Sequence, residues 1–446
     1  YEKNDFDIFF NAEKNRTNNI SHRLPDGGAV IITPVFAFSP ETHKTENSFT
    51  GTHEYTAAAM LAAFEAEYAK KINENISIGA LAGYGTHRSS ASDFPEAGQK
   101  RENNFSKFQY LASATYMLPL PGSSYYISAA AGNKSGYNIH EMPSFRAIDT
   151  MYQQSGNSFF EQAGAIQESP FVYNHYNRDS VFTYEDSMNK TEIKNSLNMS
   201  TFGFSIGTGI EKYGESEAAG SFSVYPVISG KMSEETVTTA LDTEESYSTE
   251  AESYECIRDG IEIVMRSMGR YYFDAFIIGL KLDYLNTDYK IYNSADDEYP
   301  DDINMNFLNV SAGTALRFIE NIMMPVEFFI LSGSRKSTGG FETKTEIFEA
   351  GCRAGAEYEL NSSISLRGGG SFSSRTVSTG NEPAGTAENQ AQNKAAFSLG
   401  AGYGSENMEI GASLGYNIIM LSPSDGVITD YSDNEAVFVL DFKFFI

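Results

Sequence analysis

The residues that could do chemistry in this chain are few and scattered. A catalytic histidine must be held beside a carboxylate or hydroxyl partner at a fixed place. The six histidines instead fall in expected connections, at strand ends or in the first 27 residues: His22, His43, His53, His87, His140 and His175. The sequence therefore predicts no catalytic residues, no cofactor and no enzyme.

An acidic run and two cysteines also carry little chemistry. Carboxylates at 296–302 are of the type that binds Ca²⁺, but their spacing does not match a calcium loop, so we expect a solvated acidic connection and no metal site. Cys256 and Cys352 are too few for a disulfide framework. The net charge of −27 excludes nucleic acid as a partner, because phosphates require a basic surface.

Five arginines are more informative, because they lie within expected strands in the second half of the chain. By their alternation with Leu316, Phe348 and Leu366, they fall on the face of the strands that does not carry these apolar residues. They are Arg317, Arg335, Arg353, Arg367 and Arg375. The acidic side chains assigned to the same kind of face include Glu65, Glu67, Glu327, Glu349 and Glu357. Charged side chains cannot be buried in a dry core at acceptable cost. They indicate a water-filled passage, or salt-bridge ladders between strands around a closed lumen.

The elements that must position these residues are alternating runs of about ten residues separated by tight polar turns. In 348–358 and 397–403 one face is apolar, while the other is glycine, serine or charge. No stretch reaches the ~18 to 20 apolar residues of a membrane helix, which excludes a helical membrane protein. A strand of an outer-membrane barrel needs only ~9 to 11 residues, apolar on one face. A soluble β-sandwich is the alternative, but the many glycines and serines on one face favour the barrel.

Counting the runs predicts about sixteen strands, within a range of about 14 to 18, in an all-β, antiparallel, up-and-down transmembrane barrel. We place them at 28–38, 55–69, 76–87, 104–117, 124–136, 191–212, 219–232, 256–268, 272–291, 304–319, 324–337, 341–359, 363–377, 394–404, 408–420 and 434–446. The run 57–67 would also suit a helix on intrinsic propensity. A hairpin is preferred there because a turn and another strand follow it.

The barrel domain is expected at 28–446, with short periplasmic turns and long extracellular loops. The long connections fall at about 39–54, 88–103, 137–190, 233–255, 292–303, 378–393 and 421–433, and the longest, 137–190, would join the fifth and sixth strands. Residues 1–27 form a polar leader that could be a periplasmic segment, an extra strand or a plug. No signal peptide opens the chain, so we interpret Tyr1 as a mature or truncated start.

The final run places Phe438, Phe442 and Phe444 on one face and continues to the last residue. It resembles the C-terminal signature of Gram-negative outer-membrane proteins, in which an alternating strand that ends in an aromatic residue closes the barrel. The departure is that Ile446, rather than an aromatic residue, is terminal. The resemblance implies a location in the cell outer membrane, with outer-membrane lipid and lipopolysaccharide as surroundings.

The position of the longest connection resembles that of the pore-constricting loop in general diffusion porins, a sixteen-stranded family. The resemblance implies that Asp149, Glu161 and Glu168 face the arginines across a constriction, and it makes a homotrimer one assembly to expect. The Pro-Glu-Phe-Gly-Gly motif of enterobacterial porins is absent from this segment. An external lid is the alternative for 137–190.

Three functions follow from these patterns. The first is a porin-like channel for passive diffusion of small hydrophilic solutes or ions, mildly cation-preferring because an acidic mouth concentrates cations. The second is a ligand-specific transporter that resembles the fatty-acid transporter family, with residues 1–27 as a hatch inside the barrel. The third is a structural or adhesive surface barrel with a sealed lumen.

Overall fold

The computed structural model describes most of the chain. The described residues are 29–47, 51–92, 99–133, 176–185, 189–212, 215–240, 246–248, 252–273, 275–292, 301–319, 321–338, 342–361, 363–382, 386–405, 408–422 and 428–445. The leader at 1–27 and the acids Asp149, Glu161 and Glu168 lie outside these ranges.

The described residues are organised as strands. Their bounds are β1 Ala29–Asn47, β2 Gly51–Lys71, β3 Ile76–Ser92, β4 Gln99–Leu120, β5 Ser123–Gly132, β6 Tyr176–Glu185, β7 Asn189–Thr201, β8 Gly203–Lys212, β9 Ser216–Ala240, β10 Ser246–Ser248, β11 Glu252–Tyr272, β12 Phe276–Ile291, β13 Asp301–Ile319, β14 Ile322–Thr338, β15 Glu342–Glu359, β16 Ile364–Glu382, β17 Thr386–Ser405, β18 Met408–Ser422 and β19 Ile428–Phe445. No helix among the described residues is long and apolar enough to cross a bilayer.

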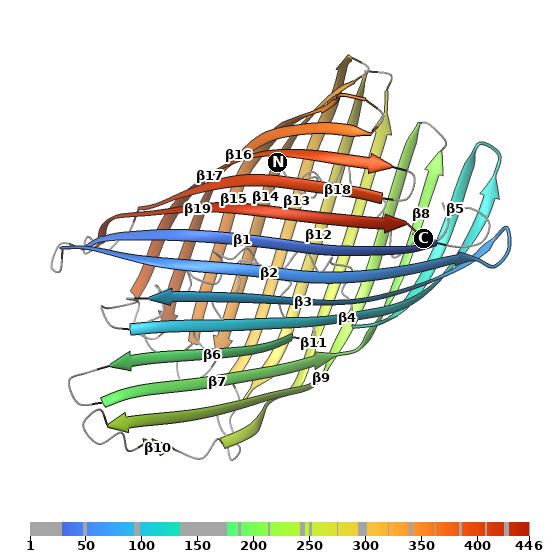
Figure 1. Cartoon of the computed structure of the whole chain (residues 1–446). Coiled ribbons are helices and arrows are strands. Elements are labelled where there is room, and N and C mark those ends of the chain that lie inside the picture. Colours follow the sequence, from blue (N-terminus) through green and yellow to red (C-terminus); the bar gives the residue numbers. More distant parts are fainter. Residues whose placement is uncertain are drawn as a thin grey trace.

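The strands form one antiparallel sheet that closes on itself (Figure 1). Closure occurs where β1 pairs with β19 on one side and with β2 on the other. Three positions in the wall are each built from two consecutive strands: β5 with β6, β7 with β8, and β10 with β11. Counted this way, the nineteen strands occupy sixteen positions around the described wall, which confirms the expected barrel of about sixteen strands.

Side-chain exposure alternates along each strand and separates an outer from an inner face. In β12, Leu280 is 55% exposed and Asp283 is 5% exposed. Large apolar side chains on the outer face include Phe204 at 65%, Phe328 at 63% and Leu399 at 71% exposed. Such a band suits contact with hydrocarbon, while the opposite parity carries glycine, serine and charge. A single closed sheet with an exposed apolar band is incompatible with a two-layer sandwich.

The alanine-rich run 57–67 is strand throughout and lies in β2. It pairs along its length with β1 on one edge and β3 on the other. Pairing on both edges outweighs the intrinsic helix propensity of alanine, which is worth only tenths of a kcal/mol per residue. The preferred hairpin is therefore confirmed and the helical alternative is wrong.

The strands extend much further than expected at the end away from the tight turns. The connection expected at 39–54 is mostly strand, because β1 continues to Asn47 and β2 begins at Gly51. The connections expected at 88–103 and 378–393 are shortened in the same way. These strand tips carry polar side chains on both faces, so they lack the alternation that reveals a strand in sequence.

The longest connection was placed wrongly in two respects. The range 137–190 contains β6 and the start of β7, and the connection does not join the fifth and sixth wall positions. It lies instead within the fifth wall position, because β5 and β6 both pair with β4. β5 pairs with Leu111–Leu120 of β4, and β6 pairs with Gln99–Lys107. An insertion within a strand cannot be recognised from hydrophobic alternation alone.

Asn133 completes the hydrogen bonding of the β4 backbone at the point where β5 ends. Its side-chain oxygen accepts a hydrogen bond from the Tyr110 amide (2.6 Å), and its side-chain nitrogen donates to the Phe108 carbonyl (2.8 Å). Its own backbone amide donates to the Tyr110 carbonyl (3.0 Å). Asn133 is fully buried. The asparagine thus continues the ladder of β4, whose backbone would otherwise lack partners beside hydrocarbon.

We expect Asn133→Leu to destabilise the barrel by about 1–3 kcal/mol, because it leaves one backbone donor and one acceptor of β4 unpaired. Asn133→Asp keeps the acceptor but replaces the donor with a buried carboxylate oxygen facing the Phe108 carbonyl, so near neutral pH its cost should be at least as large. Urea unfolding in phospholipid vesicles measures both. Equal stability of the leucine variant and the unaltered protein would contradict this role.

Candidate functional site

The inner face of β11–β16 carries a dense set of ionisable side chains, which we call the charged inner wall. Its described members alternate with outward-facing residues along their strands. They are Glu262, Arg266, Arg270, Lys281, Asp283, Glu327, Arg335, Glu349, Arg353, Glu357, Arg367 and Arg375. Glu262 is 0% exposed and Arg375 is 4% exposed. Charges buried to this degree must be balanced by nearby partners.

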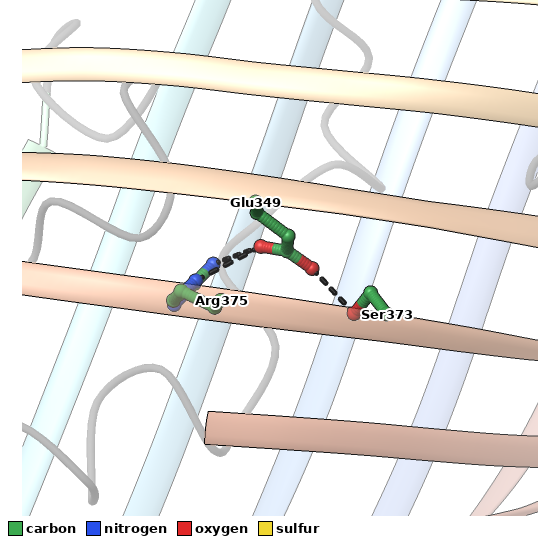
Figure 2. Close-up of polar contacts among 3 residues, drawn as sticks. All are labelled: Glu349, Ser373 and Arg375. Carbon is green, nitrogen blue, oxygen red and sulfur yellow. Dashed lines mark hydrogen bonds and ion pairs between the residues drawn. The ribbon is translucent and has the colours of Figure 1, made fainter. Parts of the chain in front are cut away.

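The tightest pairing joins Glu349 of β15 to Arg375 of β16 (Figure 2). Both Nε and Nη2 of Arg375 donate to Oε2 of Glu349, at 2.9 and 2.6 Å. The second carboxylate oxygen accepts a hydrogen bond from Oγ of Ser373 at 2.6 Å. The two charged residues are directly opposite in register, so strand pairing itself positions the contact. Charge-assisted bonds of this kind are about twice as strong as neutral ones.

A second pair lies nearer the tight turn at Asn361. Nη2 of Arg367 contacts Oε1 of Glu357 at 3.2 Å and also donates to Oγ of Ser365 at 3.2 Å. These two charged residues are again opposite one another in register. Gly402, on the neighbouring strand β17, leaves the room that the guanidinium occupies: an added Cβ would lie 3.2 Å from Nη2. A glycine on one strand therefore accommodates the arginine of the next.

Arg353 has a different environment. Its guanidinium lies over the Phe329 ring, 4.7 Å from the ring centroid. In register it faces Glu327 on β14 and Ser371 on β16. The aromatic face and the acidic neighbour both favour a cation at this position.

Asp283 of β12 contacts two cations at once. Oδ1 of Asp283 is 3.6 Å from Nε of Arg266, and Oδ2 is 3.2 Å from Nζ of Lys281. All three side chains are at most 12% exposed. This three-residue group extends the charged inner wall onto β11.

An apolar row crosses the same inner face. On each strand it lies two residues beyond the level of Asp283 and Glu349, on the side away from the tight turns. Val264, Leu285, Phe307 and Ile347 are buried and occupy one level of the register on β11, β12, β13 and β15. Gly333 completes the level on β14, where an added Cβ would collide with the Phe307 ring. The inner wall thus holds an apolar strip beside its charges.

The structure brings four of the predicted site residues onto one inner surface: Arg335, Arg353, Arg367 and Arg375. Arg317 is on β13, opposite Met323 in register, and its side chain is outside the described part. Glu65 and Glu67 lie in β2, across from Gly83 and Leu81 of β3, and their side chains are likewise not described. The pore-lining role of all these residues stays a prediction.

Sequence reasoning missed the part of the charged inner wall on β11 and β12. Arg266 and Arg270 share the parity of Glu262, and Met265 and Tyr271 lie on the opposite parity with 40% and 46% exposure. The alternation within 262–271 could have revealed this charged face. The paired side chains also correspond to the expected alternative of salt-bridge ladders between strands.

The described residues contain no group of three or more histidine, cysteine or acidic side chains that could hold a metal ion. The free cysteines, Cys256 and Cys352, are on different strands that do not pair with one another. The chemistry that the inner wall offers is therefore electrostatic: rows of fixed charges, several of them paired across strands, face the interior of a cylinder.

No protein-family model and no curated protein matches the chain. Among solved structures, a mutant of TodX, a monoaromatic hydrocarbon channel, has a TM-score of 0.41 at 9% identity over 95% of this chain and 91% of its own. The toluene transporter TbuX of Ralstonia pickettii also has 0.41, at 9% identity over 97% and 93%. OccAB3 of Acinetobacter baumannii has 0.38, at 8% identity over 94% and 100%.

These similarities are too distant to transfer a substrate. The chain's own closed wall and apolar outer band make it a Gram-negative outer-membrane β-barrel, surrounded by membrane lipid.

One expectation from the sequence is corrected by the same comparison. The sequence indicated no enzyme, yet OmpT, an outer-membrane protein of Vibrio cholerae, is among the similar structures, with a TM-score of 0.29 at 10% identity over 95% of this chain and 99% of its own. The exclusion of enzymatic activity is withdrawn.

A double-mutant cycle can measure the coupling energy between Glu349 and Arg375. Glu349→Gln leaves a buried guanidinium without its counter-charge and should cost about 3–5 kcal/mol of unfolding free energy. The double variant Glu349→Leu with Arg375→Leu should cost clearly less than the two single leucine variants added together. Urea titration of the refolded barrel in vesicles provides the values. Strict additivity would show that the two side chains do not act as a pair.

Proposed function

We propose that this barrel is a porin-like channel for passive diffusion of small hydrophilic solutes or ions, mildly selective for cations. The observation that carries the proposal is the distribution of charge: fixed ions line the inner face of the cylinder, and the outer face is apolar. Fixed charges along an interior favour water and polar solutes over apolar ones.

The preference for cations rests on the acidic surplus, a net charge of −27, much of it in segments between the expected strands. A mouth of one sign raises the local concentration of counter-ions. The proposal includes the constriction expected from the porin resemblance, with Asp149, Glu161 and Glu168 facing the arginines. It also includes assembly as a homotrimer.

A second candidate is supported by the apolar row. Val264, Leu285 and Phe307 give the interior an uncharged strip, which suits a transporter of apolar ligands with residues 1–27 as its hatch. The two candidates differ in the kind of solute that passes through the interior of the barrel. Vesicles containing the barrel would swell with small sugars if the channel is polar, whereas accumulation of an apolar solute without ion conductance would favour the second candidate.

For the channel, Arg353→Gln is the sharpest test, because it removes an inner-wall cation and leaves Glu327 opposite it in register. We expect the cation-to-anion permeability ratio to rise by roughly twofold or more, since a fixed charge in a low-dielectric passage acts strongly on ions. Reversal potentials across planar bilayers under a KCl gradient measure the ratio.

The matched control is Lys336→Gln, which removes the same charge from an exposed side chain on the outer face of β14. It should leave the reversal potential unchanged. A barrel that conducts no ions would overturn the proposal in favour of a sealed structural or adhesive barrel. Equal shifts from both variants would show that selectivity arises from overall charge and not from the inner wall.

A further inference from the structure

The two ion pairs between β15 and β16 differ in how completely their charged groups are hydrogen-bonded. In the Glu349–Arg375 pair, two guanidinium nitrogens donate to one carboxylate oxygen, and the neighbouring serine donates to the other oxygen (Figure 2). In the Glu357–Arg367 pair, a single contact of 3.2 Å joins Nη2 to Oε1. We refer to the second pair as the open ion pair.

Atoms without a hydrogen-bond partner are found on both members of the open ion pair. Among the described residues, Oε2 of Glu357 and Nε of Arg367 have no such partner. The nearby serine does not supply the acid, because Oγ of Ser365 accepts a hydrogen bond from Nη2 of Arg367. Glu357 is only 8% exposed, and the Arg367 side chain is 17% exposed, so a solute in the interior reaches the pair at the guanidinium. A confined ion with an incomplete set of partners costs free energy, which a suitable solute would recover.

Glycines surround the open ion pair on the inner face. Gly355 and Gly369 are opposite one another in register, two residues further from the tight turn, and Gly400 lies opposite Arg367. The guanidinium itself lies over Gly402 of β17, where an added Cβ would be 3.2 Å from Nη2 and 3.4 Å from Nη1. No side chain projects inward from these four positions, so a small solute can approach the pair along the wall.

The open ion pair presents one charge of each sign side by side, so it requires no surplus of either sign on the wall. The next level along the strands is uncharged and holds Gly355, Gly369 and Ser398. A guanidinium donates to carboxylates through several N–H groups, and a carboxylate accepts from ammonium groups. A solute that carries both an ammonium and a carboxylate complements both members of the pair. A solute with only one charge is attracted by one member and repelled by the other.

We propose that the open ion pair is a low-affinity recognition site for small zwitterionic solutes of the amino-acid type. The carboxylate of the solute contacts the guanidinium of Arg367 and the hydroxyl of Ser365, and its ammonium group contacts the carboxylate of Glu357. The inference rests on the proposed function as a channel and names a class of solute that the interior favours. The adjacent tight turn at Asn361 faces the periplasm in barrels of this type, so the site lies at the periplasmic end of the interior.

The test measures binding separately from conduction. Saturation-transfer NMR on the full chain in nanodiscs follows L-alanine, with propionate and ethylammonium as probes that each carry one of its two charges. The unaltered barrel should bind L-alanine about fivefold more tightly than either single ion, the size expected from one additional partly exposed ion pair. Arg367→Gln should remove the preference over ethylammonium, and Glu357→Gln the preference over propionate. A pair that only holds two strands together would not change the order of the three probes.

Two glycine variants test the position of the site without any change in charge. Gly402→Ala should weaken binding of L-alanine about fivefold, because the added methyl group displaces the guanidinium. Gly380→Ala is the matched control at the far end of β16, where nothing lies within 4 Å of an added Cβ, and it should leave binding unchanged. Migration of unboiled samples on gels confirms that every variant is folded.

The two readouts separate the site from the channel. Equal binding of the three probes by the unaltered barrel, or equal loss of binding in both glycine variants, would overturn the inference even if planar bilayers show ion conduction. A barrel that prefers L-alanine in the expected way and conducts no ions would instead contradict the proposed channel and retain the site.

Discussion

Every backbone amide and carbonyl that lies in hydrocarbon needs a partner within the protein, because no water is there to supply one. This constraint dictates the closed sheet, in which the seam between β1 and β19 leaves no open edge. It also explains how the described wall continues where one position is divided between β5 and β6. Between β5 and β6 the side chain of Asn133 takes over the hydrogen bonds that a strand would have made.

Closure makes the two faces of the sheet unlike, and strand register then organises each face into rows. A shift of one residue would exchange every inward side chain for an outward one. The register that places Glu349 against Arg375 on the inside also aligns Ser332 with Phe348 on the outside. The inner ion pairs and the outer apolar band are therefore fixed by the same hydrogen bonds, although they face different surroundings.

The charges of the inner wall are largely matched to one another. Glu349 with Arg375, Glu357 with Arg367, and Asp283 with two cations are all cross-strand or same-strand neighbours. Matching reduces the cost of holding ions in a confined interior. The apolar row around Leu285 and Phe307 lies beside these pairs, so the interior combines two kinds of surface within one wall.

The sequence alone determined the class of fold, the number of wall positions and the face on which Arg335, Arg353, Arg367 and Arg375 lie, because alternation with period two is a local property of each strand. Tertiary structure decided which acid meets which arginine, where the strand tips end, and that β5 and β6 share one wall position beside β4. Those features depend on register between segments far apart in the chain, and neither polar strand tips nor an insertion leaves a periodic trace.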